Sequence, residues 1–154
     1  MIVRVVVAVV LTAALFAVAA PMISTARADA ADSSLDRQLT ALGERLARLV
    51  ATNDPTAGPG ARHVTELTLP ARTATSAGVD RLRLHNVAGV GLASWQVGDD
   101  GRDTARLAGV PIRRAGGGTL TLAEPGPHRL VFSLRRPANR TVLTVRRLGG
   151  EGDA

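Results

Sequence analysis

The chain has 154 residues, which is room for one small domain with appended segments and too little for several domains. It contains no cysteine, so disulfide bonds and thiol chemistry are excluded. All 19 basic residues are arginine, and against 13 acidic residues they give a net charge of +6. Proteins that read single strands or RNA usually stack bases on aromatic side chains. With one Trp, two Phe and no Tyr, the composition argues against a nucleic-acid partner.

Residues 1–28 are predicted to be a membrane anchor or a signal segment. Residues 5–23 are apolar except for Thr12 and Pro21, and as a helix they reach about 28 Å, close to the roughly 30 Å hydrocarbon core of a bilayer. Arg4 precedes the run, which favours an N-terminus inside the cell and the remainder outside. The predicted location is therefore the cell membrane, with a single pass and an external C-terminal domain.

A cleaved signal peptide is the alternative for the same segment. Small residues at 26–28 or 28–30 (ARA or ADA) would then form the cleavage site. The apolar run exceeds the roughly 7–15 residues usual for a signal peptide, which favours a retained anchor. Both outcomes place residues 33–154 outside the membrane.

Residues 29–54 are predicted to form an amphipathic helix. Leucines recur at alternating spacings of four and three, the 3.5-residue period of a helix-pairing seam. This seam consists of Leu35, Leu39, Leu42, Leu46 and Leu49. Two interpretations stay open: the leucines pack on the protein's own sheet, or they pair with a helix of another membrane-anchored subunit.

Residues 55–61 form a predicted linker of turn-forming residues, and residues 62–148 a β-rich extracytoplasmic domain. Seven short runs in it alternate between apolar and polar residues, separated by Gly and Pro. They span residues 64–69, 79–85, 92–97, 102–107, 119–123, 128–136 and 140–148. This spacing is typical of a small antiparallel β-sandwich or β-sheet. Together with the helices it predicts the α+β class, and residues 149–154 are predicted to be a disordered tail.

Alternation also predicts which residues of these strands face the core. The inward rows are Leu67, Leu69, Leu82, Leu84, Ala93, Trp95, Val97, Leu120, Leu122, Leu130, Phe132, Leu134, Leu143 and Val145. Glycines 89, 91 and 116–118 are assigned to turns, and residues 98–101 to a hairpin turn.

No motif in the chain indicates catalysis or metal binding. His63, His85 and His128 share no metal-ligand spacing, so we expect solvated positions. Asp99 and Asp100 begin like a cation loop, but no Glu follows at the required spacing. No nucleophile lies in a recognised pattern with a base. The sequence therefore predicts a protein that is not an enzyme, with no cofactor, no metal and no evident small-molecule substrate.

Paired arginines in the last two predicted strands form a candidate anion-docking site. The residues are Arg135, Arg136, Arg146 and Arg147. Alternation sends one member of each pair to each face, so at least one sheet face carries a row of arginines. Such a row either is solvated and keeps strand edges from pairing, or docks on an anionic partner.

Asn139 begins the sequence Asn-Arg-Thr, an acceptor sequence for N-glycosylation. It falls on a predicted hairpin loop of an exported domain, where a glycan could be attached. Asn139 is therefore a candidate glycosylation site.

A retained anchor would make residues 5–52 one long helix, kinked near Pro21. An apolar first half and an amphipathic second half leading to a sheet domain is the pilin-like layout. The opening MIVRVVVAVVLTAALFAVAAP, the segment PGARHVTELTLPAR and the endings AEPGPHRLVFSLRR and VLTVRR resemble a group of single-span haloarchaeal membrane proteins. That resemblance implies a membrane location, genes beside type IV pilus-like or secretion machinery, and a supporting role there.

Two hypotheses for function follow. The first is a non-enzymatic, membrane-anchored extracytoplasmic protein, an accessory or pilin-like component of a surface filament or secretion system. Its partners would be the membrane and other membrane-anchored subunits. The alternative is an exported binding module that uses an Arg-rich sheet face to dock on anionic surface polymers or lipid headgroups.

Overall fold

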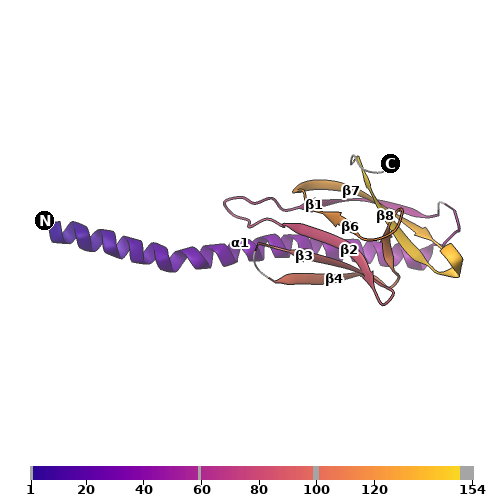
Figure 1. Cartoon of the computed structure of the whole chain (residues 1–154), viewed down its shortest axis with the longest axis horizontal. Coiled ribbons are helices and arrows are strands. Elements are labelled where there is room, and N and C mark those ends of the chain that lie inside the picture. The colour runs from indigo at the N-terminus through magenta and orange to yellow at the C-terminus, as the bar shows by residue number, and fades with distance from the viewer. Residues whose placement is uncertain (1, 59, 99–100, 150–154) are drawn as a thin grey trace.

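The computed structural model describes residues 2–58, 60–98 and 101–149. Within them lie one long helix, a single 3₁₀ turn and two four-stranded sheets, which confirms the predicted α+β class (Figure 1). The elements are α1 (Ile2–Thr52), β1 (Arg62–Leu69), β2 (Arg81–Val87), β3 (Val90–Gln96), β4 (Arg102–Ala108), β5 (Ile112–Arg114), β6 (Leu120–Leu122), β7 (Gly126–Arg135), η1 (Pro137–Asn139) and β8 (Val142–Leu148). Residues 99–100 of the predicted hairpin turn and 150–154 of the predicted tail lie outside the described range.

Helix α1 divides into a free half, up to about residue 26, and a packed half from there to Thr52. Its 51 residues are helical without interruption, including Pro21, and span about 76 Å. Figure 1 shows the N-terminal half projecting away from the domain and bending gently along its length, while a kink at Pro21 itself stays a prediction. Residues 3–17 are exposed, from 50% for Val7 to 75% for Val3 among the large apolar side chains. Contact with the domain begins near Arg27, whose carbonyl oxygen accepts a bond from the Ala77 N–H, and Ala28 is the first buried residue.

The two sheets form a sandwich around one apolar core. Their strand orders are β1-β7-β8-β5, called sheet A, and β4-β3-β2-β6, called sheet B. Every residue of the predicted inward rows is buried in this core, so the predicted alternation is confirmed. Strand β5 was not predicted, and it pairs with β8 in parallel, whereas all the other pairs are antiparallel.

The packed half of α1 closes one side of the sandwich. It contacts β1 and β4, which are the edge strands of sheets A and B on that side. Leu35, Leu39, Leu42 and Leu46 are at most 2% exposed within the shared core, and Leu49 packs against it half-buried. The leucine seam therefore packs on the protein's own sheets. This corrects the alternative of pairing with a second helix, because the sheets already occupy the seam.

Specific polar bonds hold the helix to the edge strand β1 and to β3, the strand beside the edge of sheet B. The Gln38 side-chain amide forms two bonds with the backbone of Thr68 on β1: its Nε2 donates to the carbonyl oxygen (3.0 Å) and its Oε1 accepts from the N–H (2.9 Å). Trp95 Nε1 donates to Asp32 Oδ1 at 2.6 Å. At Gly43 an added Cβ would lie 3.4 Å from the Arg106 carbonyl oxygen, so glycine allows close approach to β4. The helix thereby covers the edge strands β1 and β4, which would otherwise be open to pairing with another chain.

The linker and turns hold the ends of the strands in place. Thr56 bridges to Arg135 of β7, so this part of the predicted linker is fixed to sheet A; Pro59 lies outside the described residues. Gly89 lies in the turn between β2 and β3, as predicted. Gly91 instead lies in β3, where an added Cβ would meet Ile112 Cγ1 at 2.5 Å. The absence of a side chain at Gly91 therefore leaves the space in which Ile112 of β5 packs against sheet B.

Candidate functional site

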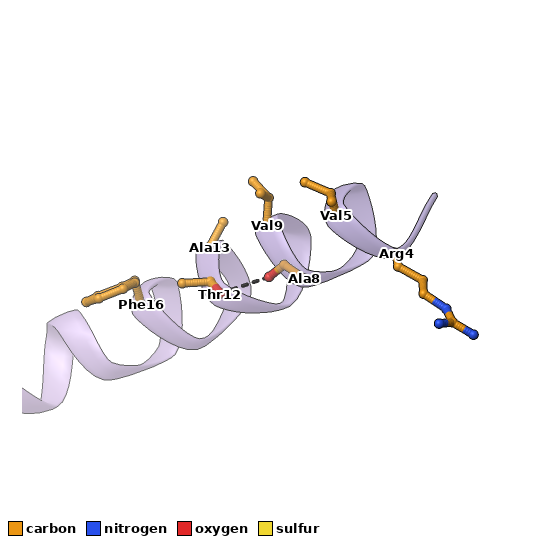
Figure 2. A pocket seen from close by; sticks show the side chains of 7 residues that line it. All are labelled: Arg4, Val5, Ala8, Val9, Thr12, Ala13 and Phe16. Carbon is orange, nitrogen blue, oxygen red and sulfur yellow. Dashed lines mark hydrogen bonds between the residues drawn. The ribbon is translucent and has the colours of Figure 1, made fainter. Parts of the chain in front are cut away.

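The free half of α1 presents an apolar surface to its surroundings. It is long and apolar enough to cross a membrane, judged by length and composition. Figure 2 shows Val5, Val9 and Ala13 projecting on one side of the helix, with Arg4 projecting away from them. The hydroxyl of Thr12 donates to the Ala8 carbonyl oxygen at 2.8 Å, so this polar side chain is satisfied within the helix. That arrangement suits a hydrocarbon environment, where unsatisfied polar groups are costly.

The outer face of sheet A carries five exposed arginines, called the sheet A arginine face: Arg62, Arg113, Arg129, Arg135 and Arg146. They surround Val131 and Ser133, which are nearly buried although they point outward. Long arginine side chains can cover such residues with their methylene stems. Among the strand residues described on this face, only Glu66 is acidic.

The four arginines predicted as one docking site do not share a face. Arg135 and Arg146 lie on the sheet A arginine face. Arg147 is instead in register with buried Leu130, and its Nη2 pairs with Glu124 Oε2 at 2.9 Å. Arg136 follows the end of β7. Alternation could not place it because the strand ends one residue earlier than expected.

The outer face of sheet B is basic as well. Its exposed arginines, called the sheet B arginine face, are Arg81, Arg83, Arg102 and Arg106. Between them, β3 contributes Leu92, Ser94 and Gln96. The described strand residues of this face include no acid. Alternation with inward Leu82 and Leu84 places Arg81 and Arg83 outward. The sequence alone could not show the whole face, because strand pairing is what brings the β4 arginines beside them.

The histidines are less exposed than predicted. His128 is 2% exposed, and its Nε2 donates to the Glu124 carbonyl oxygen at 2.7 Å. His63 and His85 are half-buried. The expected solvated position is thus wrong for His128, which lies in the inward row of β7 with Leu130. Within the described ranges, no cluster of three or more His, Asp or Glu is placed to hold a metal ion.

Asn139 is exposed at the end of η1, in the turn between β7 and β8. Its left-handed backbone, with φ of 62°, is one that asparagine tolerates well. Arg135 beside this turn bridges to Thr56, which follows the C-terminal end of α1, so the turn lies at the end of the domain away from the free half. Glycosylation there stays a prediction.

Comparison with known proteins identifies a family and no characterised relative. No curated protein and no solved structure matches the chain. A family model described as "Domain of unknown function (DUF7311)" matches residues 2–148. The match takes in the apolar half of α1, its packed half and both sheets, so helix and sandwich form one family unit. The chain belongs to this DUF7311 family.

Proposed function

We propose that this protein is a non-enzymatic, membrane-anchored subunit with its sandwich domain outside the cell, acting as an accessory or pilin-like component of a surface filament or secretion system. The observation that carries the proposal is the division of α1. One half is apolar and exposed, and the other half is part of the domain core. The resemblance of the sequence to haloarchaeal single-span proteins supports the same placement.

Retention of the anchor is favoured over cleavage by contacts at the candidate cleavage sites. The Arg27 carbonyl oxygen accepts a bond from the Ala77 N–H at 3.1 Å. Ala28 and Ala31 belong to the core. Cleavage after residue 28 or 30 would remove the Arg27–Ala77 bond and Ala28. It would also leave a new charged N-terminus against the domain. A signal segment has no need of such contacts, whereas a retained helix gains a fixed connection to its domain.

Assembly with other subunits would use the free half of α1. The leucine seam is occupied by the sheets, so pairing of helices between subunits falls to residues 3–23. In lipid, helices associate by close packing at small residues. Ala8 and Ala13 lie on the surface drawn in Figure 2, next to Val9. The proposal therefore expects intersubunit contact on this surface.

Cysteine cross-linking tests this assembly, since the chain has no native cysteine. Ala13→Cys should give disulfide-linked species in native membranes, with the chain itself or with a neighbouring subunit. Thr40→Cys is the control, because this exposed position lies on the packed half of the helix. Monomer alone at Ala13 and at neighbouring positions through one full helical turn would contradict assembly through the anchor.

The sheet B arginine face supports a second candidate, an exported module that docks on anionic surface polymers. Four guanidinium groups with no described acid on their face attract polyanions, and salt screens that attraction. Retention of the detergent-solubilised chain on an acidic glycan matrix should fall steeply as salt rises.

Replacing Arg81, Arg83, Arg102 and Arg106 by Gln should abolish that retention. The matched control removes the same charge from Arg37, Arg45, Arg48 and Arg140, which are exposed elsewhere. Equal loss in both variants would show that only net charge matters, and this would rule out docking by the face.

A further inference from the structure

A polar pocket of about 510 Å³ lies where the free half of α1 enters the domain. One wall is α1 itself. The other is the loop between β1 and β2, which Figure 1 shows at the end of the domain from which the free half emerges, together with Val97 and Gly98 after β3. The Ala77–Arg27 backbone bond holds this loop to the helix. The polar lining residues include Ser24, Arg27, Arg72, Thr73, Ser76 and Asp80.

The lining is rich in hydrogen-bond donors. Arg27 Nε is buried and has no hydrogen-bond partner among the described residues. A buried N–H of a charged group without an acceptor is costly, so a small rearrangement of the Arg27 side chain around an acceptor in the pocket would relieve that cost. Ser76 Oγ accepts from the Gly78 N–H at 3.3 Å, which leaves its own hydrogen to be donated. The pocket thus offers donors from both of its walls.

The charge of the lining also favours an anion. Among the described lining residues are two guanidinium groups, from Arg27 and Arg72, and one carboxylate, from Asp80. Arg72 Nη2 lies 3.7 Å from Asp80 Oδ1, and both side chains are more than half exposed, so this ion pair is weak. Guanidinium groups match phosphate oxygens in a bidentate fork. Breaking the ion pair with Asp80 so that Arg72 can bind a phosphate therefore costs little free energy.

The position of the pocket along α1 matches the depth of lipid phosphates. The apolar run ends at Ile23, and Arg27 lies four residues further, or about 6 Å along the axis. The interfacial layer on each side of the hydrocarbon core is about 5–8 Å thick. In a membrane-inserted chain, the mouth of the pocket would lie in that layer.

We infer that this pocket binds the phosphate group of an anionic ligand, with Arg27 and Arg72 as its two cationic contacts and Ser76 as a hydroxyl donor. The depth argument rests on the proposed membrane anchoring, whereas the donor set does not. Two sources share the chemistry: the phosphodiester of a lipid with net negative charge, where no choline cation neutralises it, and a free phosphate or phosphate monoester. In either case the ligand bridges α1 and the β1–β2 loop, so its binding stabilises the folded domain.

Thermal unfolding of the full chain tests this inference. Trp95 is the only tryptophan in the chain and lies in the core, so its fluorescence reports unfolding. In neutral detergent the probes are inorganic phosphate and glycerol phosphate. In vesicles, phosphatidylcholine alone is compared with phosphatidylcholine containing phosphatidylglycerol. We expect a higher Tm with at least one phosphate source. A response to lipid alone identifies the headgroup, and a response to free phosphate identifies a soluble ligand.

Variants assign the effect to the pocket. Arg27→Gln should weaken the apparent affinity for phosphate about tenfold or more, the effect of losing one charge-assisted contact. Arg72→Gln should do the same, and its exposed side chain makes a folding defect negligible. Arg106→Gln on the sheet B arginine face removes equal charge and should keep full affinity.

Two results would overturn the inference. One is an unchanged Tm of the native chain with every phosphate source. The other is equal stabilisation of the native, Arg27→Gln and Arg72→Gln chains. The phosphate titration in detergent needs neither a membrane nor a partner. Its result therefore tests the pocket even if cross-linking finds no assembly.

Discussion

Leu42→Asp should unfold the sandwich domain. Leu42 is 2% exposed between the two sheets, and truncating a buried leucine to Ala already costs about 2–5 kcal/mol. Asp adds an unpaired carboxylate in the core, which raises the cost further. Domains of this size have about 5–15 kcal/mol of stability in total, so little or no folded protein should remain. Loss of the cooperative change in Trp95 fluorescence on heating would show it.

Ala47→Asp is the matched control, because Ala47 is exposed on the same half of the same helix. It should unfold at a temperature close to that of the native chain. A Leu42→Asp chain that keeps the native Tm but no longer forms oligomers would show that the leucine seam pairs with a helix of another subunit. That result would contradict the placement of α1 in the sandwich.

Placing Asp at both Val9 and Ala13 should release the chain from the membrane. A charged residue at the centre of a spanning helix costs about 2.5–3.5 kcal/mol, so the pair costs about 5–7 kcal/mol. This corresponds to a change of roughly 10⁴-fold or more in membrane partitioning. The measurement is the fraction of protein in the membrane pellet after an alkaline wash, followed by intact mass. The native chain should pellet with residues 1–30 present.

Asp at both Thr40 and Ala47 controls for added charge, since both positions are exposed on the packed half of α1. This variant should pellet like the native chain. Recovery of the native chain as a soluble species that begins near Asp29 or Ala31 would establish the signal peptide instead. That result would contradict retention of the N-terminal helix as an anchor and every proposal that depends on its insertion.

The strands could be predicted wherever alternation is carried by large apolar residues. Leu130, Phe132 and Leu134 determine the inward row of β7 without any knowledge of its neighbours, and the structure buries all three. The same rule extended by one step would have placed His128 inside. The expected solvated position treated His128 as an outward or loop residue, although it lies two residues before Leu130 in the same strand.

Other features depend on pairings that no local pattern encodes. Strand β5 has three residues, too few to show alternation, and it exists because Gly91 on β3 leaves room for Ile112. The bond between Trp95 and Asp32 joins positions 63 residues apart. The sheet A arginine face draws on four strands, so Arg62 and Arg113 could join Arg135 only once the register was known. The polar pocket beside Arg27 likewise depends on the β1–β2 loop, which folds back onto α1.

The insertion of α1 between two edge strands has a mechanical consequence. In a chain anchored as proposed, a pull on the sandwich directed away from the membrane would load the helix along its own axis, so the interface would be sheared and not peeled. Shear strains the bonds from Gln38 to Thr68 and from Asp32 to Trp95 together with the leucine row, all at the same moment. Peeling would break them one after another at low force. We therefore expect a chain anchored as proposed to resist force best when it acts along the axis of α1.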